Sequence, residues 1–212
     1  MRMPKRRLET IAAACGAMLA AGLLTLAAPA HAQFSEGYRF LEAVRKKEGD
    51  KVETLLGEAG STVILSRDLA TGKGALHIVT ERRDIAWLRY LVAKGADVNM
   101  RDDKGVTPIQ LASGLGWLEG VAFLVERKAD LDQSDDTGET PLINAVHRRD
   151  TAMMRVLLKG GADPDRSDNS GRSARDYARL EKGAQLLDVI EANAKAKSAA
   201  GKAGSPVYGP TF

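Results

Sequence analysis

The sequence predicts an all-α solenoid of about five stacked helix–turn–helix repeats, joined by short β-turn or hairpin tips. The first observation is a period: Gly72, Gly105, Gly138 and Gly171 lie 33 residues apart, each in a short polar segment. The second is that each polar segment precedes an apolar run with helical spacing. A unit of this length cannot bury its apolar side alone, so the copies must stack on one another.

Two segments show how each unit begins. Residues 102–112 (DDKGVTPIQLA) align with residues 135–145 (DDTGETPLINA). The Asp-x-x-Gly part predicts a turn with a left-handed glycine. Thr107 and Thr140 are placed to cap a helix, and the proline after each fits the first helical position, where no hydrogen bond is lost. A short first helix and a longer apolar second helix are therefore expected in each unit.

This pattern resembles the ankyrin repeat, whose sequence runs D-x-x-G-x-T-P-L-H-x-A, then G-x-x-x-[IV]-V-x-L-L-L, then G-A-D-[VI]-N. The resemblance covers roughly residues 37–192, and Gly95–Asn99 is a complete C-terminal loop of the family. It implies a degenerate first repeat with a longer exit loop and a last repeat that caps the C-terminal end. The implied repeats span approximately 37–66, 67–101, 102–134, 135–167 and 168–192.

Two departures from the family pattern concern regularity and stability. Only the second repeat keeps the family histidine, His77, while Gln110, Ile143 and Asp176 replace it in later repeats. We therefore expect gaps in the ladder of hydrogen bonds between repeats. Lys128 stands where glycine is usual, and a left-handed backbone there would cost on the order of 1 kcal/mol.

Residues 1–32 predict a cleaved secretory signal peptide. A basic start precedes an Ala/Leu-rich stretch from Ile11 to Ala28, and a small-x-small motif predicts cleavage after Ala32. The alternatives are a membrane anchor and a lipoprotein at Cys15. The apolar stretch is short and weakly hydrophobic, and too few apolar residues precede Cys15. We expect a periplasmic or secreted protein without a membrane span after cleavage.

Cleavage changes the composition. Of 31 Lys and Arg and 28 Asp and Glu residues, four basic and one acidic residue lie in the leader, which leaves 27 of each sign. No basic stripe remains for a nucleic-acid partner. Cys15 is removed as well, so no disulfide can form and packing must hold the domain together.

Residues 193–212 predict a flexible C-terminal tail, a fraying helix followed by disorder, because Lys, Ala, Gly, Ser and Pro dominate it. Its end, Val207–Phe212, is more apolar than a solubilising tail requires. This end is either inert or docks on a partner or on the body of the protein.

No set of residues predicts catalysis, a cofactor or a metal site. Gly114–Gly120 looks faintly like a phosphate loop, but the spacing differs and the segment coincides with a turn between helices. The acids of residues 130–135 recur 33 residues later and do not meet the EF-hand pattern. His77 and His147 are the only histidines after cleavage, and no G-x-S-x-G or H-E-x-x-H motif is present. We expect a protein that is not an enzyme.

Four side chains need individual interpretations. We expect His77 to be structural, as in the family. His147 is either a solvated side chain or a contact residue. Trp87 falls at a core position of a second helix, so packing is its natural role. Trp117 falls at the start of a second helix and is either a packing or a contact residue.

The resemblance implies binding through the turn tips and the exposed side of the first helices, which line a concave face. Leu115 is the most informative candidate, because an apolar residue facing the partner anchors better than another charge. The alternative is that these residues are ordinary solvated surface. The positions carried over are Thr71, Lys73, Glu81, Arg82, Asp103, Lys104, Val106, Leu115, Asp136, Thr137, Glu139, His147, Arg148, Asn169 and Arg172, with the adjoining Arg149.

These observations predict a non-catalytic, monomeric scaffold, exported to the periplasm, that binds a protein partner through the concave face. A hydrolase or ligand-binding protein using the same face is an alternative, as is an envelope component tethered through the apolar tail. Resemblance to small exported ankyrin proteins also implies an accessory role in immunity to a co-encoded toxic effector or in peroxide-related stress protection.

Overall fold

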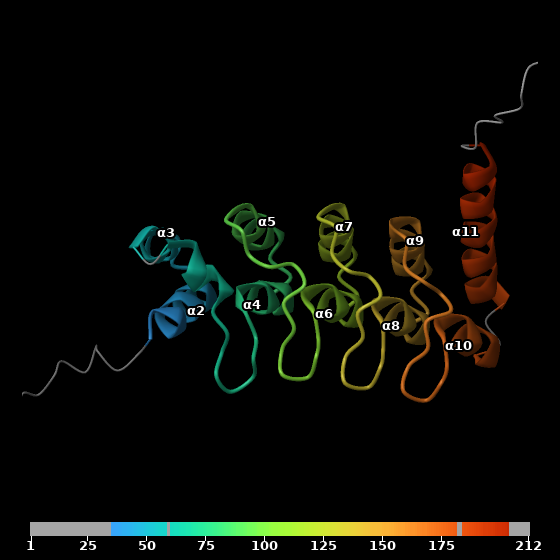
Figure 1. The fold of residues 1–212 in the computed structure, drawn as a ribbon, viewed down its shortest axis with the longest axis horizontal. Helices are drawn as coiled ribbons and strands as arrows, with labels where there is room; N and C mark the ends of the chain where they lie inside the picture. Colours follow the sequence, from blue (N-terminus) through green and yellow to red (C-terminus); the bar gives the residue numbers. More distant parts are fainter. Residues whose placement is uncertain (1–34, 59, 182–183, 204–212) are drawn as a thin grey trace, which may run out of the picture. The chain divides into compact units, whose positions relative to one another are not determined.

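The computed structural model describes residues 35–58, 60–181 and 184–203, and its helices alternate between two rows (Figure 1). One row holds the first helices of the repeats: α2 (Glu36–Lys46), α4 (Ala75–Glu81), α6 (Pro108–Gly114), α8 (Pro141–His147) and α10 (Ala174–Leu180). The other row holds the second helices: α3 (Gly49–Glu58), α5 (Ile85–Ala93), α7 (Leu118–Glu126), α9 (Thr151–Gly160) and α11 (Ala184–Ala203). The predicted all-α solenoid is confirmed.

The first repeat leaves through a 3-10 helix, η3 (Gly60–Leu65), in the place where a longer exit loop was expected. In the described ranges the only β contacts are two isolated bridges at tips, Arg67 with Gly74 and Ser167 with Ser173. None of the helices in those ranges is long and apolar enough to cross a membrane.

Some segments expected from the sequence lie outside the residues that the structure describes, and the C-terminal segment is described only in part. The signal peptide 1–32, its cleavage after Ala32 and the apolar end Val207–Phe212 lie outside the described residues. The tail was expected to begin at residue 193 with a fraying helix, and this position lies within α11, which continues to Ala203. The alanines and lysines of this stretch have high helix propensity, which accounts for the continuation.

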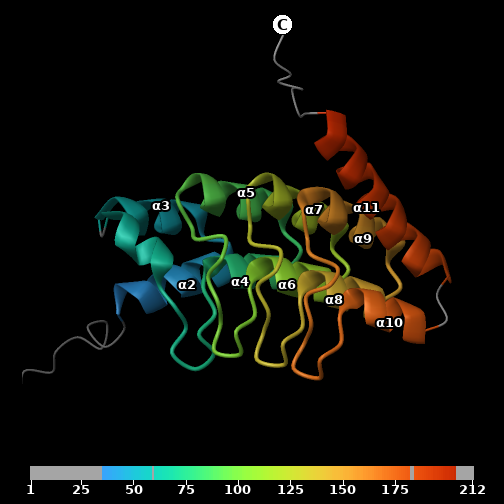
Figure 2. The same cartoon turned by 45° about the vertical axis from the view of Figure 1, so that its right-hand side comes forward.

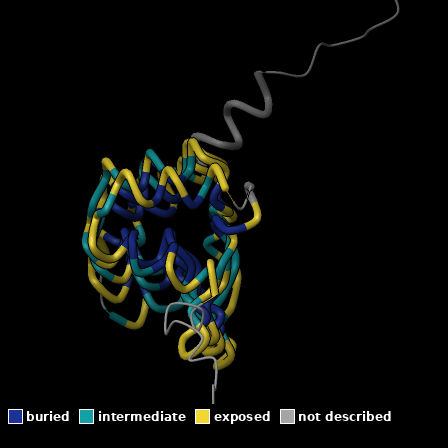
Figure 3. Tube along the Cα trace, turned by 90° about the vertical axis from the view of Figure 1, so that its left-hand side faces the viewer, coloured by how far each residue is buried: buried dark blue, intermediate teal, exposed yellow. Residues whose placement is uncertain are grey.

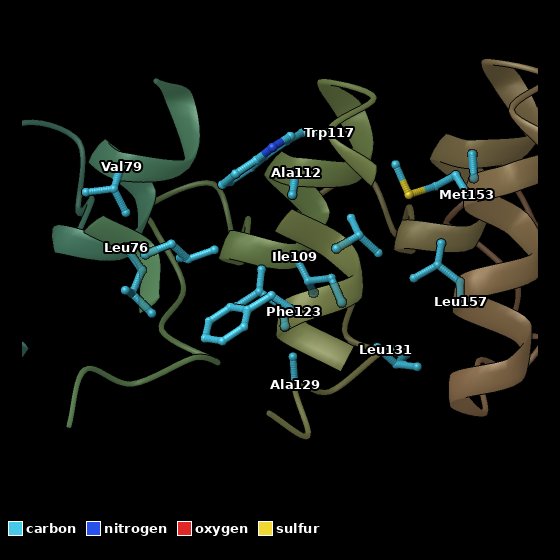
Figure 4. Close-up of a cluster of buried hydrophobic side chains, with 14 of the residues drawn as sticks. Leu76, Val79, Ile109, Ala112, Trp117, Phe123, Ala129, Leu131, Met153 and Leu157 are labelled. Carbon is cyan, nitrogen blue, oxygen red and sulfur yellow. The ribbon is translucent and has the colours of Figure 1, made fainter. Parts of the chain in front are cut away.

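The core lies between the two rows, where buried residues line the inner sides of both (Figure 3). The first helices contribute small side chains such as Ala112 and Ala145, and the second helices contribute large ones such as Leu124 and Leu157, all fully buried. Figure 4 shows buried side chains of successive repeats, among them Leu76, Ile109 and Leu157. Burying each large aliphatic side chain contributes about 1.5–3 kcal/mol, so stacking is the main source of stability.

The Thr-Pro motifs cap the first helices as predicted. The Thr107 hydroxyl accepts a hydrogen bond from the Gln110 N–H at 3.4 Å, and the Thr140 hydroxyl accepts one from Ile143 at 3.3 Å. Each following proline occupies the first turn of its helix. Caps of this kind contribute about 1 kcal/mol each.

His77 joins two repeats and is structural, as expected. Its Nδ1 accepts a hydrogen bond from the Gly74 N–H at 3.2 Å, so Nε2 carries the proton and donates to the Val106 carbonyl at 2.9 Å. The side chain is fully buried. Burial lowers the pKa of His77, and the hydrogen bond from Gly74 also requires the neutral imidazole.

The expected gap in this ladder at Gln110 is wrong. The Gln110 amide oxygen accepts a hydrogen bond from the Thr107 N–H at 2.9 Å, and its amide nitrogen donates to the Glu139 carbonyl at 2.8 Å. A primary amide offers one acceptor and one donor, like a neutral imidazole. The ladder stops at Ile143, whose side chain has neither.

Lys128 has the left-handed backbone expected for it, with φ of 62°. Gly95 and Gly161 occupy the same place in the neighbouring repeats and are also left-handed. Lysine carries a Cβ there, so the end of α7 is strained where the ends of α5 and α9 are not.

We predict that Lys128→Gly raises the free energy of unfolding by about 1 kcal/mol, because glycine removes the Cβ clash of the left-handed backbone. Urea denaturation of the mature chain measures the change. Lys128→Ala is the matched control, since it removes the charge and keeps the Cβ. A gain in both variants would assign the effect to charge and contradict the backbone explanation.

A second prediction concerns acid. Because the folded-state pKa of His77 is lowered, the stability it contributes is present above its unfolded pKa, ordinarily about 6.5, and falls as the pH drops through the folded value. We expect His77→Gln to reduce the loss of unfolding free energy between pH 7.5 and 5.5 by about 1 kcal/mol. Lys104→Ala, at an exposed tip, is the control and leaves that loss in place. Equal losses in wild type and His77→Gln would refute the assignment.

Candidate functional site

The tips of the repeats lie side by side along the edge of the first helices (Figures 1 and 2). Backbone hydrogen bonds join each tip to the next: Asp103 N–H to Thr71 O at 3.1 Å, Asp136 N–H to Lys104 O at 3.0 Å, and Asn169 N–H to Thr137 O at 3.2 Å. We call the surface formed by these tips and the C-terminal ends of the first helices the first-helix face. The contact residues predicted from sequence all lie on it.

An aspartate closes each tip from within. Oδ1 of Asp135 accepts hydrogen bonds from the N–H groups of Thr137 and Glu139 at 2.9 and 3.0 Å, and Asp68, Asp102 and Asp168 act in the same way. The hydroxyls of Thr71 and Thr137 also donate to these carboxylates, at 3.0 and 2.6 Å. Both threonines were predicted as contacts, and both already use their hydroxyls to hold a tip.

Two of the predicted arginines connect neighbouring repeats. Nη1 of Arg82 donates to the carbonyls of Val44 and Arg45 at 2.6 and 3.1 Å, at the end of α2. Nη1 of Arg148 donates to the Gly114 carbonyl at 3.1 Å, at the end of α6. Carbonyls at the end of a helix have no partner within it, so each arginine supplies one from the next repeat.

The end of α6 receives a second arginine from the other side. Nη2 of Arg83 donates to the Leu115 carbonyl at 2.7 Å. Arg82 and Arg83 correspond to Leu115 and Gly116 one period later, so the third repeat has no arginine of its own at this turn. Its neighbours on both sides supply the donors instead.

Two positions eight residues apart, one at the tip and one at the end of the first helix, carry different side chains in each repeat on this face. In the second repeat Lys73 Nζ lies 2.5 Å from Glu81 Oε1. The third repeat has Val106 and Gly114 in these positions, and the half-buried Leu115 follows them. The first-helix face therefore carries an ion pair in the second repeat and apolar residues in the third.

The fourth repeat carries an acid and a histidine at the same two positions. His147 Nε2 lies 3.9 Å from Glu139 Oε1, and His147 Nδ1 lies 3.6 Å from Glu181 Oε1 at the end of α10. The imidazole packs edge to face against the ring of Tyr177, and the two ring centroids are 4.4 Å apart. Sequence reasoning missed Tyr177 and Glu181 as neighbours of His147, although Glu181 is one period after Arg148 and so could have been placed.

The two tryptophans differ in burial. Trp117 is only 8% exposed, and its ring fills the space beside Gly120, so it is a packing residue. Trp87 is half-buried, and the expected core position is only partly correct. The wall of α3 that faces it is built from Gly49, Asp50 and Glu53, which leave a cavity of about 370 Å³ instead of covering the ring.

The segments that resemble ligand loops have structural roles. Gly116 is the left-handed residue of a turn between helices, and Gly120 makes room for Trp117. The carboxylates of Asp130 and Asp132 accept hydrogen bonds from the backbone N–H groups of Asp132 and Asp163, at 3.0 and 2.8 Å. Within the described ranges, no group of three or more acids and histidines is arranged to hold a metal ion.

Comparison with known families gives two matches. A family model described as ankyrin repeats (3 copies) matches residues 40–135, and one described as ankyrin repeats (many copies) matches residues 124–178. Together they cover most of the helical body, from α2 into α10. The comparison with curated proteins found no match.

The two roles of the predicted contact residues can be separated by stability. We predict that Arg82→Ala lowers the free energy of unfolding by about 1 kcal/mol, because the carbonyls of Val44 and Arg45 lose their donor. Lys104→Ala should stay within about 0.5 kcal/mol of wild type, as expected for a surface side chain. Urea denaturation compares the two, and equal effects would contradict the structural role of Arg82.

Proposed function

Because the chain belongs to the ankyrin repeat family, whose domains are typically non-catalytic interaction modules, we propose that it is an exported scaffold that binds a protein partner. The binding surface is the first-helix face. Export to the periplasm is the part of this proposal that rests on the leader-like residues 1–32 alone.

The observation that carries the proposal is a set of exposed side chains that take no part in holding the repeats together. Lys104, Asp136 and Arg172 are exposed at successive tips. Across the part of the chain that the structure describes, their side chains form no hydrogen bond or ion pair with other residues. Val106 and Leu115 are half-buried, at the tip and at the end of the first helix of the third repeat. Apolar anchors together with free charges are the composition of a protein interface.

Export has its own test. Fractionation of producing cells should place the protein in the periplasm, and mass spectrometry of the purified protein should give an N-terminus at Gln33. Recovery of full-length protein in the membrane fraction would favour an uncleaved anchor, and recovery in the cytoplasm would contradict export.

We predict that Leu115→Glu reduces capture of the partner from a periplasmic extract at least tenfold, because a charge replaces an apolar anchor. Leu118→Glu is the matched control: Leu118 is an exposed leucine that begins α7 in the row of second helices. Circular dichroism establishes that both variants are folded. Loss of capture by Leu118→Glu with normal capture by Leu115→Glu would move the binding site to the second helices.

A further inference from the structure

Among the described residues, Glu139 is a carboxylate on the first-helix face that has no lysine or arginine paired with it. In the second repeat the corresponding carboxylate–cation pair, Glu81 with Lys73, is closed at 2.5 Å. In the fourth repeat the corresponding cationic partner is a histidine, whose Nε2 stays 3.9 Å from Glu139 Oε1, beyond hydrogen-bonding distance. The side chain of Glu139 keeps a third of its surface exposed. These two positions thus form a close ion pair in the second repeat, whereas in the fourth repeat the two side chains form no hydrogen bond with each other.

The surroundings of Glu139 and His147 suit a cationic group. Glu181 approaches the other imidazole nitrogen at 3.6 Å, and the ring of Tyr177 forms a wall at 4.4 Å. Leu180, which occupies the position of His147 one period later, is 62% exposed. On the opposite side Gly114 leaves open space, since a Cβ there would meet nothing within 4 Å. Carboxylate and aromatic ring together match the charge and the aliphatic stem of a basic side chain.

The other charged groups around His147 are already engaged. Arg149 pairs with Glu181 at 3.0 Å, and Arg148 donates to the Gly114 carbonyl. Asp150 caps α9 by accepting from the Met153 N–H at 2.9 Å. Asp168 accepts from the Tyr177 hydroxyl at 2.5 Å. None of these contacts neutralises Glu139, so its charge is available to a partner.

We propose that Glu139, His147 and Tyr177, beside the Arg149–Glu181 ion pair, form a subsite for a lysine or arginine side chain of the protein partner, with His147 as an internal competitor. The neutral imidazole leaves Glu139 free to pair with the incoming cation. The protonated imidazole places its own charge between the two carboxylates and repels the cation. This inference rests on the proposed function, because it assigns a partner chemistry to part of the first-helix face.

Thermodynamic linkage predicts how the strength of cation binding at the subsite changes with pH. Histidine is the side chain that ordinarily changes charge between pH 5 and 8, whereas glutamate carboxylates ordinarily stay ionised over that range. If a bound cation disfavours protonation of His147, protonation must weaken cation binding by the same factor. Binding is therefore stronger at pH 7.5 than at pH 5.5.

The experiment uses acetyl-arginine-amide as the probe and acetyl-citrulline-amide as its neutral counterpart, added at millimolar concentration to the mature chain and followed by NMR. We expect arginine to shift the resonances of Glu139, His147 and Tyr177, and citrulline to shift them much less. Glu139→Gln should weaken the arginine effect about two- to fivefold, the range for an exposed ion pair. Glu81→Gln, at the closed pair of the second repeat, is the matched control and leaves it unchanged.

His147→Gln tests the competitor. This variant should bind arginine as well at pH 5.5 as at 7.5, whereas wild type binds more weakly at 5.5. Equal shifts with arginine and citrulline, an unaffected Glu139→Gln variant or pH-independent binding in wild type would each overturn the subsite. If partner capture remains sensitive to Leu115→Glu but not to Glu139→Gln, the subsite is wrong and the proposed function stands. If capture is insensitive to Leu115→Glu, the proposed function fails separately.

Discussion

Burial of apolar side chains between consecutive repeats is the interaction on which the rest of the structure depends. A two-helix unit of this size cannot bury its apolar face alone, and only a neighbour completes its core. The fully buried Ala112, Ala145, Leu124 and Leu157 show that completion. The hydrogen bonds of His77 and Gln110 and those between tips follow from it, because stacking brings donor and acceptor into register.

That register also explains how one position can serve either structure or recognition. Each site on the first-helix face recurs once per repeat, so the scaffold tolerates any side chain there that the neighbouring repeats can satisfy. At one such position Arg82 and Arg148 donate hydrogen bonds to carbonyls at the end of the preceding first helix, whereas Leu115 is apolar. At another the chain alternates between Glu81, Gly114 and His147. Variation at fixed positions on a rigid frame is how repeat proteins acquire specificity.

The sequence predicts the fold almost completely, because the period, the Thr-Pro caps and the left-handed Lys128 are local signals. It predicts less of the site. The ladder through Gln110 is missed when only residue identity is compared, since an amide and an imidazole share hydrogen-bonding groups without resembling each other. The carbonyls that Arg82 and Arg148 reach belong to other repeats. The half-covered Trp87 depends on which side chains α3 presents, and no pattern within α5 reveals it.

The doubly supported end of α6 has a consequence for how the domain comes apart. Its last carbonyls depend on Arg83 from the preceding repeat and Arg148 from the following one. Fraying of either flank therefore removes a partner from the middle, so local opening at one side lowers the cost of opening the centre. The second, third and fourth repeats should then exchange their amide hydrogens as one cooperative unit. The surface proposed for binding would be presented or lost as a whole.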